Sequence, residues 1–550
     1  MDGMFNLARV FGTIAEALGD QDCVVIGKQR RSYREVADRA IRLAVYLHSR
    51  GLGIKTERAD LAGYQSSQDH LALALWNGSE YLEGMVGAYA ARVAPFNVNY
   101  RYVGEELQYL LQDAAPAGVM FHASYAPVLA PVLESLPPMA VLLQVADESG
   151  NPLLPGAVDY EEAIASVPSA APRVEPSGDD LYLLYTGGTT GMPKGVLWRQ
   201  HDIFLAAMGG RSLGTWEEVD SYEKVAARAL DKRGLSVLML PPLMHGAAQW
   251  STFMGIGAGA TIIFPPDPRH LDPRDVLGTI EREQVNVVIL VGDATLRPLL
   301  DEFERESYDL SSVGGVANGG AVLSTPLRDR LHRLLPQAVI ADAAGSSETG
   351  AQMMQTSAGE AGSAGLFVPG PGTVVVSESF SHVLSPGDKH LGWLAQSGYI
   401  PLGYLNDPVK TASTFPEING IRYSIPGDRA RVLDDGRIEL LGRDAATINS
   451  GGEKIFAEEV ESAIAGHPAV MDVVVTGRDS DRWGQEVIAI VALRRDVSAT
   501  FDEIVQHASS FIARYKLPKD VVFVDSVQRS PSGKADYQWA KEQARQGGTV

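Results

Sequence analysis

The sequence predicts an α/β protein with a large amino-terminal part built on parallel sheets, a small β-barrel-like part, and a smaller carboxy-terminal α+β domain. Three observations predict this class. The chain has 550 residues, which is more than one hydrophobic core usually supports. Short apolar runs alternate with helical patterns through much of its length. Near Gly370 the pattern changes to hairpins, followed by a compact mixed region.

The elements of the amino-terminal part follow from residue spacing. Arg34–Arg50 places apolar side chains on one face and ends at Gly51, which predicts an amphipathic helix. Glu83–Arg92 predicts a short helix, and Val93–Val98 an extended segment. From Leu181 onward, apolar runs end in Gly-rich or polar turns, which predicts parallel strands covered on both faces by helices. These runs are Leu181–Tyr185, Ser236–Leu240, Ala260–Phe264, Val287–Val291 and Ala338–Ile340.

The carboxy-terminal third has a different organisation. Asp434-Asp435-Gly436, between Arg429–Leu433 and Arg437–Leu441, is a strong tight-turn signal and predicts a hairpin. After Gly442 we expect a compact region with a loop, the helix Ala457–Ala465 and the strands Val470–Thr476 and Glu486–Leu493. A helical stretch and a final strand, Val521–Val524, complete it. The predicted domains are therefore 1–442 and 443–550.

Composition restricts the class of partner. The formal net charge of −21 argues against nucleic acid, because phosphate contacts need clustered Lys and Arg. No apolar run reaches the roughly 18 residues that a membrane-spanning helix needs, so we expect no integral membrane association. Met1–Val10 lacks the pattern of a secretory signal. The single cysteine, Cys23, excludes an internal disulfide framework, fits a reducing cytoplasm and is interpreted as a small buried hydrophobe.

A glycine-rich loop, Tyr185–Val196, follows the apolar run Leu181–Leu184. Its glycines let backbone amides turn inward, and its threonine hydroxyls and lysine ammonium add donors, which together suit phosphate oxygens. The loop is not a Walker A motif, because Lys194 lies between Pro193 and Gly195 and opens no helix. The residues expected to hold phosphate are Thr186, Gly187, Gly188, Thr189, Thr190, Gly191 and Lys194. A second glycine cluster, Gly255–Gly259, precedes a strand instead of following one and predicts close packing of a helix on that strand.

The loop Tyr185–Val196 resembles the phosphate-binding loop of the adenylate-forming superfamily, which includes acyl- and aryl-CoA synthetases, peptide-synthetase adenylation domains and luciferases. The resemblance covers essentially the whole chain, and the motifs occur in the family's order. It implies ATP, Mg²⁺ and CoA as cofactors and a small-molecule carboxylate as substrate. Nothing in the sequence indicates an oligomeric state.

The resemblance assigns further residues of the large domain. Ser346-Ser347-Glu348-Thr349-Gly350, after Gly345, resembles the family's second nucleotide motif, and Glu348 is the expected Mg²⁺ ligand. Asn318-Gly319-Gly320-Ala321 resembles the turn that lies along adenine and the acyl group, and Asp342 matches a position that meets the adenine edge. His245 matches an acyl-pocket residue and is counted with the catalytic candidates, although a lone histidine beside an apolar strand is more often structural.

The remaining motifs lie towards the carboxy terminus. Asp428 matches the aspartate that accepts hydrogen bonds from the ribose hydroxyls. Gly442-Arg443 resembles the interdomain hinge, with Arg443 near ribose or phosphate. The resemblance implies that the loop containing Gly451, Gly452 and Lys454 faces the thiol acceptor. Lys534, in Pro531-Ser532-Gly533-Lys534, matches the lysine that contacts the carboxylate and the α-phosphate during adenylation.

Two positions depart from the family. Ala344 stands where many members have a tyrosine that stacks near adenine, and Ala445 stands where the hinge usually carries Asp or Lys. The expected activity is formation of an acyl-adenylate and its transfer to CoA, with a fatty or steroid-derived acid as substrate. Apolar Met239, Leu243, Met244, Ala247 and Trp250 suit a greasy acid, or form core. There are two alternatives within the same enzyme class: transfer of the acyl group to a carrier-protein thiol, or an aryl acid as the substrate. An alternative of another class is a non-catalytic protein that binds a nucleotide or an acyl group.

Overall fold

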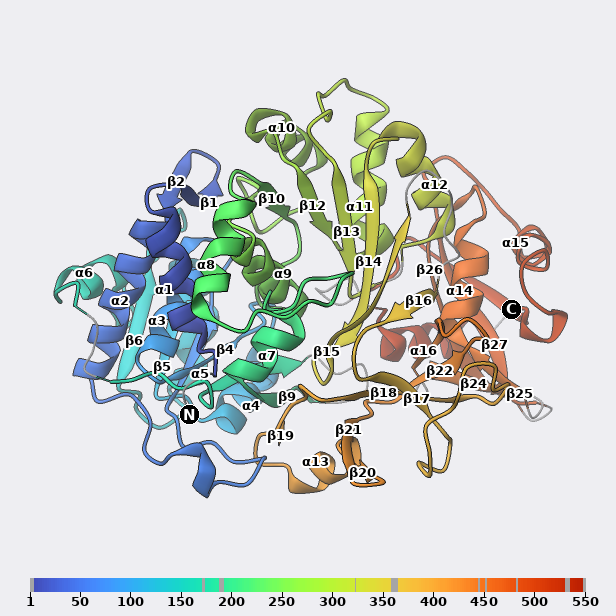
Figure 1. Cartoon of the computed structure of the whole chain (residues 1–550). Coiled ribbons are helices and arrows are strands. Elements are labelled where there is room, and N and C mark those ends of the chain that lie inside the picture. Colours follow the sequence, from blue (N-terminus) through green and yellow to red (C-terminus); the bar gives the residue numbers. More distant parts are fainter. Residues whose placement is uncertain are drawn as a thin grey trace.

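The computed structural model describes residues 4–170, 174–186, 192–321, 323–357, 365–443, 446–450, 453–480, 483–529 and 535–547. The amino-terminal part is a layered α/β body, and the carboxy-terminal residues form a separate lobe beside it (Figure 1). None of the helices in the described segments is both long and apolar enough to cross a bilayer. Cys23 is fully buried in the core, as predicted, and burial raises the pKa of its thiol well above the ordinary value.

The first sheet is entirely parallel, with strand order β4-β3-β5-β6-β7. Every residue of the interior strand β3 is buried, so both faces of the sheet are covered there, as the continuous apolar runs require. The strands are β3 (His70–Ala74), β4 (Ala94–Asn97), β5 (Gly118–His122), β6 (Val141–Val145) and β7 (Val158–Asp159), and the helices that connect or follow them are α3 (Ser79–Ala90), α4 (Gly104–Ala114), α5 (Ala126–Leu133) and α6 (Tyr160–Ala165).

The second sheet begins with six neighbouring parallel strands, in the order β1-β11-β10-β12-β13-β14. They are β1 (Asp22–Ile26), β10 (Ser236–Met239), β11 (Thr261–Phe264), β12 (Val287–Leu290), β13 (Gly315–Gly319) and β14 (Val339–Ser346), and β2 (Gln29–Ser32) adds an antiparallel edge. The helices of this part are α1 (Leu7–Leu18), α2 (Tyr33–Ser49), α8 (Tyr222–Asp231), α9 (Gly246–Gly257), α10 (Pro273–Glu283), α11 (Gly292–Phe303) and α12 (Thr325–Leu334). A capping box between Ser32 and Glu35 starts α2.

The same sheet continues as antiparallel strands after β14. Its path runs through β15, β16, β23, β22, β18, β21 and β20, and β17 pairs with β18. The predicted hairpin at Asp434-Asp435-Gly436 is confirmed, because Val432 pairs with Ile438 across it and Gly436 has a positive φ. The strands are β15 (Gly350–Ser357), β16 (Leu366–Pro369), β17 (Thr373–Val376), β18 (Gly392–Ser397), β20 (Glu417–Ile418), β21 (Ile421–Ser424), β22 (Asp428–Val432) and β23 (Ile438–Arg443).

One strand assignment is wrong. The run Leu181–Tyr185 is a strand, β8 (Leu181–Thr186), but it belongs to a three-stranded antiparallel sheet with β9 (Lys194–Arg199) and β19 (Gly403–Tyr404). The chain folds back through the glycine-rich loop, so that Leu181 pairs with Arg199 and Thr186 with Lys194. Because five consecutive side chains of β8 are buried, its periodicity does not distinguish this hairpin from a parallel strand. Helices α7 (Gln200–Ala207) and α13 (Pro408–Thr414) follow β9 and β19.

The carboxy-terminal lobe confirms the predicted α+β pattern. Its sheet has the order β25-β24-β27-β26, with β28 paired to β27. The elements are β24 (Thr447–Ser450), β25 (Glu453–Phe456), α14 (Ala457–Ala465), β26 (Val470–Ser480), β27 (Gly484–Leu493), α15 (Phe501–Ala508), β28 (Asp520–Val524) and α16 (Tyr537–Gln546). The boundary between 442 and 443 falls within β23 and remains a prediction.

Candidate functional site

The β8–β9 hairpin frames the predicted phosphate loop. Thr186 ends β8 and pairs with Lys194, which begins β9. The intervening Gly187, Gly188, Thr189, Thr190 and Gly191 lie outside the described residues. The Tyr185 hydroxyl donates a 2.6 Å hydrogen bond to Asp113 of α4, where burial raises the pKa of the carboxyl. The two ends of the loop are therefore fixed to a buried sheet and a helix.

A buried asparagine joins this hairpin to the turn that carries His245. The Asn97 amide, at the end of β4, donates to the carbonyls of Tyr185 and Met244 at 2.8 and 2.7 Å. Its carbonyl oxygen accepts from the Tyr185 amide at 2.8 Å. Asn97 is 5% exposed, so these bonds form away from water. His245 directly follows Met244, precedes the first residue of α9 and is half-buried.

Lys194 already faces an anion. Its ammonium lies 3.2 Å from a carboxylate oxygen of Asp407 and 5.6 Å from the ring centre of Tyr404. Burial alone would raise the pKa of Asp407, but the Lys410 amide and the Lys194 ammonium lower it below the usual range. The side chain of Lys194 is 41% exposed. A partly accessible cation at the mouth of a glycine-rich loop is available to a phosphate group.

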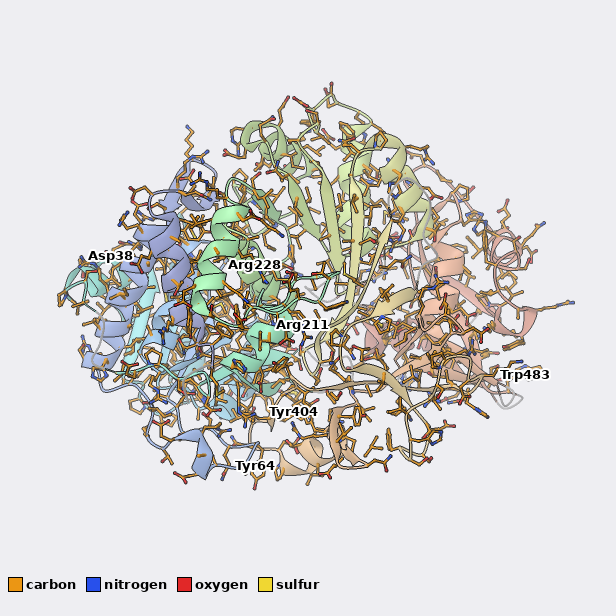
Figure 2. The ribbon with its side chains drawn as sticks, viewed as in Figure 1. Asp38, Tyr64, Arg211, Arg228, Tyr404 and Trp483 are labelled. Carbon is orange, nitrogen blue, oxygen red and sulfur yellow. The ribbon has the colours of Figure 1, made fainter. Side chains whose placement is uncertain are left out.

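Tyr404 connects Lys194 to Glu348. The Tyr404 ring is buried, and its hydroxyl donates a 2.8 Å hydrogen bond to the Glu348 carboxylate. In Figure 2 Tyr404 lies low in the middle of the molecule, where β19 meets β9. Three motifs that are far apart in the chain therefore converge: the phosphate loop, the second nucleotide motif and the β19–α13 segment.

The turn that carries Glu348 is held from two further directions. The Trp198 indole of β9 donates to the Ser347 carbonyl at 2.9 Å. The Ser424 hydroxyl of β21 donates to the Glu348 carbonyl at 2.6 Å. Within the turn, the Ser346 amide donates to the Thr349 hydroxyl at 2.9 Å. These bonds fix the backbone at 346–349 and leave the Glu348 side chain half-buried.

The carboxyl ends of β13 and β14 carry the next group of predicted residues. Gly319 pairs with Ala343, so Gly319, Gly320 and Ala321 lie beside the end of β14, in which Gly345 is the last residue but one. Asn318 donates to the Ala321 carbonyl at 3.0 Å and to the Asp342 carboxylate at 2.8 Å. Carboxyl ends of parallel strands at one edge of a sheet form a usual ligand site in α/β proteins.

Asp342 has structural partners. It is 4% exposed and forms a buried ion pair with Arg328 of α12 in addition to its bond with Asn318. A paired buried carboxylate of this kind holds strands and helices in register. Its predicted contact with the adenine edge stays a prediction.

Asp428 and Arg443 lie opposite each other. Asp428 opens β22 and pairs with Arg443, which ends β23, so their backbones are neighbours in the sheet. Ser424, four residues before Asp428, is the residue that holds the Glu348 turn. Asp428, the predicted ribose contact, therefore lies in the same short segment as the residue that hydrogen-bonds to Glu348, the predicted metal ligand. The side chain of Arg443 lies outside the described part.

The lobe's own motifs are described only in part. Gly451, Gly452 and Lys534 lie outside the described residues, and so does the side chain of Lys454, whose backbone is in β25. The ends of the Lys534 segment are described: Arg529 and Ala535 form a β-bridge. The charges of Asp472 and Arg529 act on Asp293 in the first turn of α11, while the neighbouring Gly292 amide donates to Asn318 at 2.7 Å. Arg529, which precedes the Lys534 segment, therefore lies near the first turn of α11, at the carboxyl end of β12.

The apolar candidates for the acid pocket are mostly core. Met239, Leu243 and Met244 are at most 2% exposed, and Trp250, at 8%, donates to the Tyr182 hydroxyl at 3.2 Å. Ala247 is half-buried. Of the glycines in 255–259, Gly255 confirms the predicted packing of a helix on a strand, because a Cβ there would meet Ile262 of β11. Gly259 lies against the Ala229 carbonyl of α8, and a Cβ on Gly257 would meet nothing within 4 Å.

The residues present fit a magnesium ion that takes some of its ligands from the substrate phosphates. Across the segments that the structure describes, no three or more His, Cys, Asp or Glu side chains form a metal-binding group. Mg²⁺ commonly takes one or two carboxylates and completes its shell with waters and substrate phosphates. Glu348, half-buried and oriented by Tyr404 beside the phosphate-loop lysine, suits such a shared ion.

Three contributors to the site were missed in the sequence: Asn97, Tyr404 and Ser424. Their side chains act on residues 88, 56 and 76 positions away, so local spacing does not reveal them. One local signal was present. Asp407-Pro408 is an N-cap followed by proline at the start of α13, which marks a fixed turn directly after Tyr404.

Comparison with known proteins adds the family. A family model described as AMP-binding enzyme matches residues 11–404, and one described as AMP-binding enzyme C-terminal domain matches 459–534. The chain is 55% identical over 543 residues to the medium-chain acyl-CoA ligase Mig of Mycobacterium avium, covering 99% of each chain. It is 40% identical over 527 residues to the 3-oxocholest-4-en-26-oate–CoA ligase of Rhodococcus rhodochrous, covering 93% of this chain and 91% of that one.

Solved structures share the fold at lower identity. The anthranilate CoA ligase AuaEII in complex with anthranoyl-AMP superposes with a TM-score of 0.81 at 18% identity, covering 100% of this chain and 99% of that one. The fatty acyl CoA synthetase of Mycobacterium tuberculosis gives a TM-score of 0.69 at 24% identity, covering 98% and 99%.

Proposed function

This chain belongs to the AMP-binding enzyme family, and we propose that it is an AMP-forming ligase that joins a medium-chain fatty acid to CoA through an acyl-adenylate. The observation that carries the proposal is the convergence of Lys194, Tyr404 and Glu348 beside the glycine-rich loop. A cation and an oriented carboxylate beside this loop support the binding of a nucleoside triphosphate.

The reaction has two steps. In the first, a carboxylate oxygen attacks the α-phosphorus of ATP, and pyrophosphate leaves. In the second, the CoA thiolate attacks the acyl carbonyl, a thioester bond forms, and AMP leaves with the electrons of the broken C–O bond. The adenylate replaces a poor leaving group with a good one, so positioning and charge stabilisation suffice without a side-chain nucleophile.

Each assigned residue has a task in these steps. Lys194 and the loop from Thr186 hold the β- and γ-phosphates, and Glu348 takes part in holding Mg²⁺, which neutralises phosphate charge when bound. Asp428 accepts from the ribose hydroxyls, with Arg443 opposite it in the sheet. Lys534 stabilises charge on the carboxylate and α-phosphate in the first step, and the Gly451–Lys454 loop faces the thiol in the second.

The domains 1–442 and 443–550 divide this work. The large domain supplies the nucleotide and acyl sites, and the small domain supplies Lys534 for one step and the Gly451–Lys454 loop for the other. Reorientation of the small domain about Gly442-Arg443 replaces Lys534 at the site by the Gly451–Lys454 loop. ATP and CoA as co-substrates favour a cytoplasmic location.

The acid is assigned through the relatives. A medium-chain acyl-CoA ligase is 55% identical over almost the whole chain, whereas a steroid-acid ligase is 40% identical. A medium-chain fatty acid is therefore the favoured substrate, and a steroid side-chain acid the second.

The test is AMP formation with Mg·ATP and CoA across fatty acids of short, medium and long chain, aromatic acids and a 3-oxo-steroid acid. We expect the highest kcat/KM with a medium-chain fatty acid, and acyl-CoA and AMP in equal amounts. AMP formation only with aromatic or steroidal acids would contradict the substrate assignment. ATP binding without acid-dependent pyrophosphate release would contradict the activity.

A further inference from the structure

A cluster of acidic side chains lies inside the carboxy-terminal lobe, beside residues that flank the Lys534 segment. Its centre is Glu461 of α14, and the groups that face it are Glu458 on the same helix, Asp472 of β26, Arg529 before the Lys534 segment, and Tyr537 after it. The assigned chemistry uses none of these side chains. Their placement therefore needs an explanation of its own.

Glu461 contacts both neighbours of the segment. Its carboxylate oxygen accepts a 2.8 Å hydrogen bond from the Val475 amide of β26. The Tyr537 hydroxyl donates a hydrogen bond to the same carboxyl, and the Tyr537 ring packs against the two apolar clusters of the lobe. Tyr537 is three residues after Lys534 and begins α16, so Glu461 holds the exit of the segment.

Arg529, which precedes the Lys534 segment, is also fixed by hydrogen bonds. Arg529 donates two hydrogen bonds to the Asp472 carboxylate, at 2.8 and 2.6 Å, and one to the Val473 carbonyl at 3.1 Å. Val473 is two residues before the Val475 amide that binds Glu461. A β-bridge between Arg529 and Ala535 closes the two ends on each other. Both ends are thus fixed to one short stretch of β26 and one helix.

The same helix reaches the hinge. Gly442 pairs with Arg429 in the β22–β23 ladder and has a φ of 117°, and a Cβ added to it would collide with the Glu458 carboxyl. Glu458 lies one turn before Glu461 on α14, and its carboxylate raises the pKa of Glu461 further, after burial, to about 8. Part of the Glu461 side chain remains accessible, although the group sits deep in the lobe. A carboxyl buried beside a second carboxyl is harder to ionise.

We propose that Glu461 is a positioning residue for acid activation: it fixes the Lys534 segment, through Tyr537 and beside Arg529, to the helix that contacts the hinge glycine. The inference rests on the proposed function of Lys534. In its protonated form Glu461 accepts from the Val475 amide and the Tyr537 hydroxyl without adding a further negative charge beside Glu458 and Asp472. Its loss displaces Lys534 from the α-phosphate and leaves the thiol-facing loop, on β24 and β25, in place.

The experiment separates the two half-reactions in Glu461→Ala, Glu461→Gln and Tyr537→Phe. Pyrophosphate release is measured with a medium-chain acid and Mg·ATP without CoA, and thioester formation is measured from supplied acyl-AMP and CoA. Glu461→Ala and Tyr537→Phe are expected to slow pyrophosphate release, the former on the order of 10- to 100-fold, because misplacing a catalytic group by about 1 Å costs this much. Thioester formation from acyl-AMP stays within about twofold.

The pH profile supplies a readout that a merely structural role would not move. Glu461→Gln keeps the size and hydrogen-bonding capacity of the protonated acid, so it is expected to release pyrophosphate near the wild-type rate at pH 7. Wild-type pyrophosphate release declines above pH 8 as Glu461 ionises beside Glu458, and the Gln variant loses that component of the decline. The matched control is Glu459→Gln, on the same helix but paired with Lys516 at 2.5 Å.

The outcomes are distinct. Equal loss of both half-reactions in Glu461→Ala and Tyr537→Phe, or an unchanged pH profile in Glu461→Gln, overturns the positioning role. Failure of Glu461→Ala to fold leaves the Gln and Phe variants to decide. Wild-type enzyme without acid-dependent pyrophosphate release contradicts the proposed function and not this placement.

Discussion

Replacing Tyr404 by phenylalanine removes one hydroxyl and leaves the ring. The ring still packs 5.7 Å from Phe415 and still lies under the Lys194 ammonium, so the fold is expected to survive. What is lost is the 2.8 Å hydrogen bond to Glu348. A hydrogen bond to a charged group contributes about 1.5–3 kcal/mol. If adenylation depends on that orientation of Glu348, the rate falls about 10- to 150-fold, at about 1.4 kcal/mol per factor of ten.

The assay is acid-dependent pyrophosphate release at several Mg²⁺ concentrations. We expect the Tyr404→Phe enzyme to be slower and to need more Mg²⁺, while thioester formation from supplied acyl-AMP is unchanged. Tyr33→Phe is the matched control, because Tyr33 is buried and donates to the Ala260 carbonyl at 2.6 Å in a different part of the core. It is expected to lower stability by about 1 kcal/mol without affecting pyrophosphate release. Wild-type rate and Mg²⁺ dependence in Tyr404→Phe would refute the reasoning.

Three other changes test separate parts of the account. Lys534→Ala is expected to abolish pyrophosphate release and to leave thioester formation from acyl-AMP; near-wild-type adenylation would show that the lysine is wrongly assigned. Asn97→Ala strips partners from three buried backbone groups. It should cost about 3 kcal/mol or more in urea unfolding and also slow adenylation, and unchanged stability would contradict it. Gly442→Ala meets the Glu458 carboxyl at a strained φ. It should slow the complete reaction more than either half-reaction, and equal effects would argue against a hinge there.

Local pattern was sufficient for much of the fold. The spacing of Ala457–Ala465 predicts the observed helix, and Asp434-Asp435-Gly436 predicts the observed hairpin, because in both cases the interactions that decide the structure lie within a few residues. The pairing of β8 was predicted wrongly. A run of buried apolar residues is expected both for a strand of a hairpin and for a strand of a parallel sheet, so the sequence of β8 does not reveal its antiparallel pairing with β9.

In the candidate site, too, residues in local motifs are predictable from the sequence and contacts between distant segments are not. Motifs predict Lys194, Glu348 and Asp428 as site residues, since each lies in a short run of characteristic residues. Motifs do not predict Tyr404, Asn97 and Ser424, because their contribution is a contact between segments that only the folded chain brings together. For Asp342 the motif predicts a contact with the adenine edge, which stays a prediction, and the folded chain adds two partners that local spacing does not reveal, Asn318 and Arg328.

The most direct test of the central claim is ATP–pyrophosphate exchange by the wild-type enzyme, with Mg²⁺ and a medium-chain fatty acid but without CoA. An acyl-adenylate formed reversibly at the α-phosphorus predicts exchange that requires the acid, and AMP release with acyl-CoA once CoA is added. Exchange that does not require an acid, or cleavage of ATP to ADP and phosphate, would contradict the account.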